Sequence, residues 1–235
     1  MALISKSLCW LIILNLLKLS LSTWPGSSIG FPQICNNCDC VEPNVNCFDK
    51  NIIKLDKTII PDETAEVNFS RNFIQNVPCN LSWPLSVIEM DLSRNSISDL
   101  PTCAFKQFHL LESLNLSHNK LVSLKPNQFY NFSNLSHLDL SNNGLQVLGN
   151  LFNERNGLIR LSLANNPLGK KLYRPFAIKK RKLPTVNSIF IGDAAWTVET
   201  FSYLVWLKYL DLSNVTSGLL PLEVFTNNTK LVEIR

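Results

Sequence analysis

The stretch "SLNLSHNKLVSL", residues 113–124, recurs with a similar pattern of residues between positions 89 and 172 of the chain. The other copies are "EMDLSRNSISDL" (89–100), "HLDLSNNGLQVL" (137–148) and "RLSLANNPLGKKL" (160–172). Each copy begins with polar and apolar residues in alternation, which is typical of a strand with one buried face. We therefore expect Leu114 and Leu116 to point inward and Asn115 to point outward.

The second leucine of L-x-L serves as a phase marker for the repeat. The markers are Phe69, Leu92, Leu116, Leu140, Leu163, Ile191 and Leu212, separated by 23, 24, 24, 23, 28 and 21 residues. Asparagines follow the first five by three residues: Asn72, Asn95, Asn119, Asn143 and Asn166. Phenylalanines follow four of the markers by 13 residues: Phe105, Phe129, Phe176 and Phe225.

This regularity predicts stacked coils, because one such strand cannot bury its apolar side alone and neighbouring copies share a continuous core. Buried asparagine amides would satisfy backbone groups where the chain leaves the strand, and would form a ladder. The phenylalanines would fill the far side of each coil.

The pattern resembles the 24-residue leucine-rich repeat, L-x-x-L-x-L-x-x-N-x-L-x-x-L-P-x-x-x-F, over residues 64–235, with Pro78, Pro101 and Pro221 in the family's proline slot. The resemblance implies an α/β-type solenoid, a leucine-rich repeat horseshoe with a concave parallel β-sheet and a mostly irregular convex side. We expect about seven repeats in 64–235, the last incomplete at Arg235. An uncapped edge there would expose apolar side chains, so we expect a longer protein.

The first 22 residues are typical of a secretory signal peptide. Lys6 precedes an apolar run from Leu8 to Leu21, and the small residue Ser22 follows it. A membrane anchor is the alternative, but the run is short and interrupted. We expect 1–22 to direct export and the mature chain to act outside the cell, with no later stretch suited to spanning a bilayer.

Six cysteines remain after residue 22, and an even number in an exported protein favours disulfides. The first four form C-x2-C-x-C-x6-C within "CNNCDCVEPNVNC" (35–47), for which zinc is the alternative and three disulfide connectivities are open. Residues 23–63 resemble the cysteine-rich N-terminal cap of extracellular leucine-rich repeat proteins, and this resemblance implies the pairs Cys35–Cys40 and Cys38–Cys47. Cys79 and Cys103 occupy nearly equivalent places on neighbouring coils, which favours a bridge over two buried thiols.

The net charge of +4 comes from one segment. Residues 170–182 hold seven basic residues and no acid, so subtracting them leaves −3 for the rest of the chain. The sequence as a whole is therefore not that of a nucleic-acid-binding protein. The segment is a candidate patch for a polyanion, with a solvated loop as the alternative: Lys170, Lys171, Arg174, Lys179, Lys180, Arg181 and Lys182.

Outward positions of the predicted strands form a candidate binding face, with an ordinary solvated surface as the alternative. Its members are Glu66, Glu89, Asp91, His137, Asp139, Arg160, Phe190, Tyr209 and Asp211. Seven N-x-S/T sequons predict glycosylation at Asn68, Asn80, Asn115, Asn131, Asn134, Asn214 and Asn227. Glycans at Asn68 or Asn115 would stand on the candidate face.

We predict that the protein is not an enzyme and carries no cofactor. Ser136, His137 and Asp139 are close in sequence, but adjacent strand residues cannot converge into a nucleophile, base and orienting group. No phosphate-binding loop or clustered metal site is present in the sequence.

Among exported leucine-rich repeat proteins, the chain most resembles the N-terminal part of a Toll-like receptor ectodomain. The resemblance rests on the cap, the repeats, the dense sequons and an irregular stretch at 167–206. It implies recognition of a protein or microbial-pattern ligand in innate immunity, receptor dimerisation, and membrane and signalling parts outside these residues. The alternatives are a secreted or matrix leucine-rich repeat glycoprotein that binds proteins without signalling, and a short decoy ending at Arg235.

Overall fold

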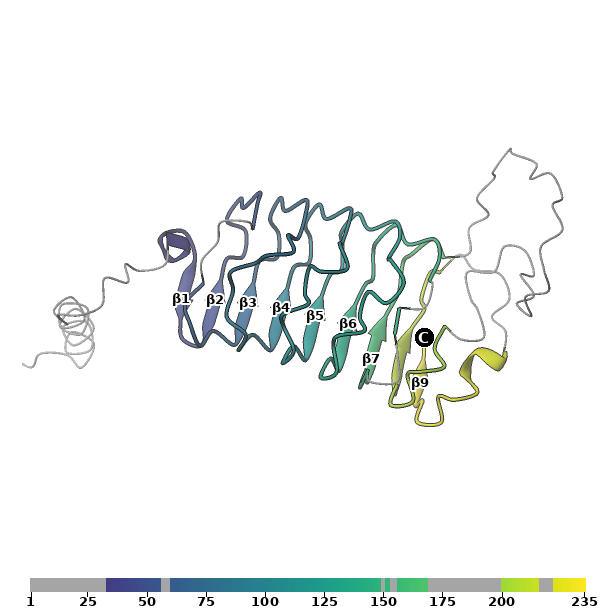
Figure 1. Cartoon of the computed structure of the whole chain (residues 1–235). Helices are drawn as coiled ribbons and strands as arrows, with labels where there is room; N and C mark the ends of the chain where they lie inside the picture. Colours follow the sequence, from purple (N-terminus) through teal and green to yellow (C-terminus); the bar gives the residue numbers. More distant parts are fainter. Residues whose placement is uncertain (1–32, 56–59, 149–150, 153–155, 169–199, 216–221) are drawn as a thin grey trace, which may run out of the picture. The chain divides into compact units, whose positions relative to one another are not determined.

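A computed structural model describes residues 33–55, 60–148, 151–152, 156–168, 200–215 and 222–235. Within these residues, short strands alternate with turns and irregular return segments, and nine strands form one sheet in sequence order (Figure 1). The strands are β1 (Asp39–Val41), β2 (Asn44–Asn46), β3 (Glu66–Asn68), β4 (Glu89–Asp91), β5 (Ser113–Asn115), β6 (His137–Asp139), β7 (Arg160–Ser162), β8 (Tyr209–Asp211) and β9 (Glu233–Ile234). Two 3-10 helices, η2 (Gln33–Asn36) and η3 (Leu222–Phe225), accompany them.

The strands from β2 onward pair in parallel with their central residues aligned, as predicted from the repeat. The central side chain of each strand from β2 to β8 is buried, while its two neighbours face outward. This alternation is the period-two pattern of the sequence. The predicted parallel-sheet solenoid is therefore confirmed.

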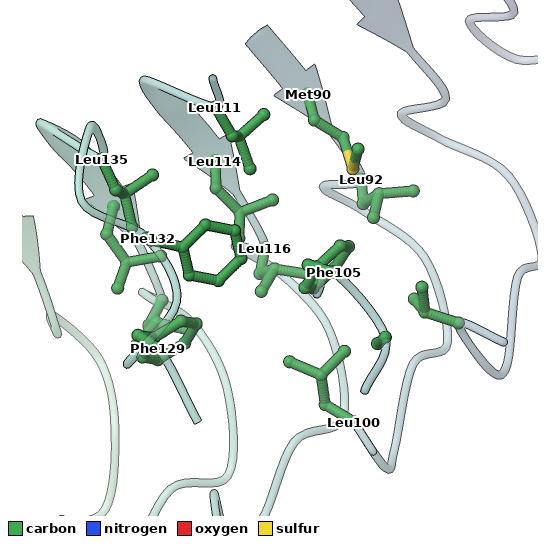
Figure 2. Packing of buried hydrophobic residues seen from close by; sticks show 14 of the residues in the cluster. Met90, Leu92, Leu100, Phe105, Leu111, Leu114, Leu116, Phe129, Phe132 and Leu135 are labelled. Atoms are coloured by element: carbon green, nitrogen blue, oxygen red, sulfur yellow. The ribbon is translucent and has the colours of Figure 1, made fainter. Parts of the chain in front are cut away.

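The core lies between the sheet and the return segments (Figure 2). Leu92 and Leu116 are fully buried behind their strands, and Phe105 and Phe129 are buried on the far side of the coils. The ring of Phe132 lies 6.2 Å from that of Phe105 in the preceding coil, measured between centroids. Burial of each such side chain stabilises the fold by roughly 1.5–3 kcal/mol, so each coil depends on the next for a large part of its stability.

The asparagine ladder is present in the structure. In Asn95, Nδ2 donates to the carbonyl of Phe69 in the preceding coil at 2.9 Å, and Oδ1 accepts the backbone N–H of Ile74 at 3.0 Å. The equivalent pair of bonds recurs at Asn119, Asn143 and Asn166. One amide thus satisfies buried backbone groups of two coils, which is the role expected from its spacing.

The residue two positions after each described marker, with Cys47 counted as the marker of the cap, has a left-handed backbone, a feature that the leucine pattern does not reveal. The φ angles lie between 53° and 56° at Asp49, Arg71, Arg94, His118, Asn142, Asn165 and Asn214. This conformation lets the N–H of Arg94 donate to the carbonyl of Ser117 in the next coil at 2.9 Å. A non-glycine residue adopts it at a cost, and asparagine is the most tolerant of those found here.

The repeat predicted around Ile191 was expected to place a strand between β7 and β8, and this prediction is wrong. Strand β7 pairs directly with β8, with Leu161 aligned with Leu210 and the N–H of Leu163 donating to the carbonyl of Asp211 at 2.8 Å. A strand edge has only one row of backbone groups, so no strand around Ile191 separates these two in the sheet. The step between the markers Leu163 and Leu212 is therefore 49 residues. The predicted strand itself falls within 169–199, outside the described residues.

The cysteine-rich segment supplies the first two strands of the sheet. β1 and β2 form an antiparallel pair, and β2 then pairs in parallel with β3, so the sheet crosses the predicted boundary at residue 63. The structure bonds Cys35 to Cys40 and Cys38 to Cys47, the pairing that the family resemblance implied. Cys47 is fully buried at the marker position of this first coil. A third disulfide, Cys79–Cys103, joins two neighbouring coils across a Cα–Cα distance of 4.9 Å.

Among the described residues, no helix has the length and apolar content needed to cross a membrane.

Candidate functional site

The exposed face of the sheet presents two side-chain columns, one from each end of the three-residue strands. The first-position column runs from β2 to β8 as Asn44, Glu66, Glu89, Ser113, His137, Arg160 and Tyr209. The third-position column runs as Asn46, Asn68, Asp91, Asn115, Asp139, Ser162 and Asp211. Adjacent members of a column come from neighbouring strands, which lie roughly 4.8 Å apart.

The third-position column helps to hold the fold. The Oδ1 of Asp91 accepts the backbone N–H of Ser93 at 2.7 Å, which closes a turn where the strand ends. The same bond to the residue two positions later is made by Asn46, Asn68, Asn115, Asp139 and Asp211, at 2.8–3.1 Å. The recurring Asn/Asp-x-Ser pattern is the sequence signal for it. Three predicted binding residues, Asp91, Asp139 and Asp211, therefore have a structural role.

The first-position column begins with two acidic side chains side by side. Glu66 and Glu89 are exposed and occupy matching positions on β3 and β4. Within the described part of the chain, neither forms an ion pair. Like charges directly opposite each other in a sheet are destabilising, and Asp91 adds a third carboxylate on β4. This end of the face therefore favours a cationic partner.

At the other end of the same column, Arg160 lies on Tyr209. The guanidinium carbon is 4.0 Å from the centre of the ring, and the two residues are matched on β7 and β8. Such a contact holds the cation by the ring's electrostatic quadrupole and leaves its N–H groups available. Arg160 has no carboxylate partner among the described residues. It is placed to bind an anionic group.

Between these ends lies His137, whose Nδ1 is 2.7 Å from the hydroxyl of Ser136. That hydroxyl also donates to the carbonyl of Glu112 at 3.1 Å, and Asp139 uses Oδ1 for the N–H of Ser141 at 2.8 Å. In a serine–histidine–aspartate triad, Nε2 contacts the serine and the aspartate holds Nδ1. The arrangement here differs on both points and gives no support to nucleophilic catalysis.

Two shallow hollows of about 400 Å³ each cover the face and meet at Ser113 and Asn115. The first, over β2–β5, is lined by three carboxylates and no basic side chain. The second, over β5–β9, is lined by His137, Arg160 and Tyr209 together with acidic residues. At its end the carboxylate of Glu233 accepts a hydrogen bond from Nε of Arg235 at 2.6 Å and raises the pKa of that guanidinium.

The remaining predicted site residues fall into three groups. Phe190 and the basic segment 170–182 lie outside the described residues. Asn68 and Asn115 are partly exposed on the face. The other sequon asparagines, Asn80, Asn131, Asn134, Asn214 and Asn227, are exposed away from it. In the described part of the chain no group of side chains could hold a metal ion.

Each coil consists of a strand, a turn and a return segment, and the coils stack along a buried asparagine ladder. A disulfide-bonded cap precedes the first coil. This is the architecture of leucine-rich repeat proteins. The leucine rich repeat family model matches residues 86–145. The described residues thus form a leucine-rich repeat solenoid with a disulfide-bonded N-terminal cap, a fold that serves as a binding module, and residues 86–145 match the leucine rich repeat family itself.

The chain is also similar to solved structures. A crystal structure of TLR13 in complex with a single-stranded RNA, ssRNA13, is similar with 26% sequence identity and a TM-score of 0.59 over 79% of this chain and 24% of that one. InlJ from Listeria monocytogenes follows with 17% identity and a TM-score of 0.49, over 80% and 33% of the two chains. The internalin InlF from the same organism has 16% identity and a TM-score of 0.45, over 73% and 47%.

The chain therefore spans about a quarter of the length of the TLR13 chain that it resembles. A search among curated proteins gave no significant match.

Proposed function

We propose that the chain is the ligand-binding N-terminal part of a Toll-like pattern-recognition receptor of innate immunity. The similarity to TLR13 over most of the chain supports this assignment. The observation that carries it is the first-position column. Its side chains vary from coil to coil and, from Glu66 to Tyr209, none bonds to the backbone of the described residues, whereas the third-position column is tied into turns. A repeat fold leaves such positions free for recognition.

The proposal places the protein outside the cell. Residues 1–22 act as the signal peptide, 23–63 as the cap and 64–235 as the repeats. Three disulfides support this location, because such bonds persist in oxidising compartments. Ligand-induced dimerisation and signalling belong to the whole receptor and form part of the same proposal. The role of this portion is binding, without catalysis.

TLR13 is found in complex with a single-stranded RNA, and a polyanion is one ligand to consider here. The acidic end of the face, with Glu66, Glu89 and Asp91, would repel phosphates laid along the sheet. A polyanion would suit the basic segment 170–182, where it would bind in a salt-dependent manner. We therefore assign protein ligands to the face and polyanions to that segment.

Binding of the purified, secreted chain to arrays of peptides, glycans and RNA would test the function. The informative variant carries Arg160→Ala and Tyr209→Ala, which removes the stacked pair from the face. The matched control carries Arg94→Ala and Tyr203→Ala, because these exposed residues are of the same types and do not line either hollow.

We expect the arrays to contain a ligand that the wild type and the control bind equally well. The variant with Arg160→Ala and Tyr209→Ala should bind this ligand at least about tenfold more weakly, because aromatic and arginine residues at the centre of an interface often contribute most of the binding energy. Equal binding by all three proteins would refute the assignment of the sheet face. Failure of the wild type to bind any array component would refute the receptor proposal.

A further inference from the structure

In the first-position column, the charged side chains that have no ion-pair partner among the described residues are acidic on β3 and β4 and basic on β7, and this division specifies a partner. We propose that the face binds an extended peptide segment of a partner protein in which two basic residues are separated by about five residues from an acidic one. The inference rests on the proposed binding function and adds the chemistry of its ligand.

The acidic pole comprises Glu66, Glu89 and Asp91. The two glutamates stand opposite each other on adjacent parallel strands and have no ion-pair partner among the described residues. Their mutual repulsion is a penalty that the folded chain carries by itself. Two lysines or arginines one residue apart in the extended ligand would remove it, because alternate side chains point to the same side, so this pole favours a pair of cations over one.

The basic pole is Arg160, which is held on the ring of Tyr209. The ring limits the movement of the guanidinium, so less conformational entropy is lost when a carboxylate binds it. Its planar donors match a carboxylate in two-point contact. Three carboxylates line the same hollow, but Asp139 and Asp211 use Oδ1 for the N–H groups of Ser141 and Ser213, and Glu233 is hydrogen-bonded to Arg235. A ligand carboxylate would therefore complete this pole.

The distance between the poles sets the spacing in the ligand. Arg160 on β7 is three strands from Glu89 on β4 and four from Glu66 on β3. At roughly 4.8 Å per strand the separation is about 14–19 Å, which an extended peptide spans with about five residues. Ser113, the smallest side chain of the first-position column, lies between the poles and leaves room for the peptide. The hollows over both halves meet at this residue.

A glycan at Asn115 would stand beside that path. The sequon Asn115-Leu116-Ser117 can be removed without a change of charge by Ser117→Ala. Alanine is already present at the equivalent place after β7, as Ala164, so the coil should tolerate it. The peptide experiment is therefore carried out on the secreted chain with and without this substitution.

The probe is a fluorescent peptide with Lys-Gly-Lys and Asp separated by about five glycine and serine residues, and the control probe has the same composition with the charges adjacent. Titrations are followed by fluorescence anisotropy at low salt, because exposed ion pairs are screened at high salt. We expect the spaced probe to bind about tenfold more tightly than the control probe. Reversal of one pole, by Glu66→Lys with Glu89→Lys or by Arg160→Glu, should abolish that preference.

Reversal of both poles together gives the sharpest result. The triple variant Glu66→Lys, Glu89→Lys, Arg160→Glu should bind the spaced probe again, because the peptide can turn end to end on the face. Glu112→Lys with Glu223→Lys changes the net charge by the same amount as the glutamate pair and lines neither hollow. This control should behave as the wild type.

Equal binding of both probes in both glycosylation backgrounds, or no recovery in the triple variant, would overturn the inference. A single-stranded homopolymeric RNA serves as a further probe. If it binds in a manner lost on Arg160→Glu while the peptide does not bind, the peptide inference fails and the binding function stands. If neither probe binds and the arrays also give no ligand, both fail.

Discussion

Asn119 is bonded to the backbone of the coil before it, with Oδ1 accepting the N–H of Ile97 at 3.0 Å. Its Nδ2 donates back to the same coil, to the carbonyl of Leu92 at 3.0 Å, and to Leu116 in its own coil at the same distance. A single buried amide therefore fixes the stacking of two repeats in the middle of the sheet.

We predict that Asn119→Ala lowers the free energy of unfolding by about 2–4 kcal/mol, because buried backbone groups on both coils lose their partner. The neighbouring exposed residue provides the control, since Lys120→Ala should change stability by less than about 0.5 kcal/mol. Thermal and urea unfolding followed by circular dichroism would measure both. A loss at Asn119 no larger than at Lys120 would show that the ladder does not couple the coils.

Removal of the Asn115 sequon by Asn115→Asp should leave the fold intact. Aspartate already occupies the same column at Asp91, Asp139 and Asp211, with the same bond to a serine N–H. Asn115→Leu, which also removes the sequon, should cost about 1 kcal/mol because the Ser117 N–H loses its acceptor.

Both substitutions should remove one glycan from the secreted chain, measured as a mass shift before and after glycosidase treatment. An unchanged glycan mass in both variants would mean that Asn115 carries no glycan. Equal stability of the two variants would contradict the capping role of this column.

The disulfide between neighbouring coils should matter more than the short one in the cap. Cys79–Cys103 closes a loop with a sequence separation of 24, against 5 for Cys35–Cys40. On chain-entropy grounds, replacing both members of a pair by alanine should cost about 3 kcal/mol for the first and about 2 kcal/mol for the second. The midpoint of urea unfolding gives both values, and the reverse order would contradict the loop-length argument.

The basic segment 170–182 should give the chain salt-dependent affinity for heparin. Changing Lys179, Lys180, Arg181 and Lys182 to Ala should weaken binding by at least about tenfold at low salt and flatten its salt dependence, because four phosphate- or sulfate-binding charges are lost. Four substitutions elsewhere, Lys54, Lys106, Lys120 and Lys208 to Ala, change the net charge equally. If heparin elution does not differ between the two variants, binding comes from net charge and the segment has no special role.

Much of the fold could be predicted from the sequence, because each repeat specifies its strand and turn through residues that are close together in the chain. The alternation around Leu114 and Leu116 specifies a strand with one buried face, and the recurrence of that strand specifies stacking, since each copy buries the apolar side of the next. Asn119 was recognisable as a ladder residue by its fixed distance from the marker. Both columns of the candidate face followed from the same phase, although the structural role of the third-position column did not.

The rest depended on contacts between residues far apart in the chain. Strand β7 pairs with β8 rather than with a strand near Ile191, and Arg160 thereby meets Tyr209 across 49 residues. Sequence spacing could not reveal this pairing, because loop-closure entropy rises only slowly with length and a long insertion costs the fold little more than a short one. The structural use of Asp139 likewise became visible only once its carboxylate was placed against the Ser141 N–H. Periodicity determined that coils stack; tertiary contact decided which coils are neighbours, and so which charges face a ligand together.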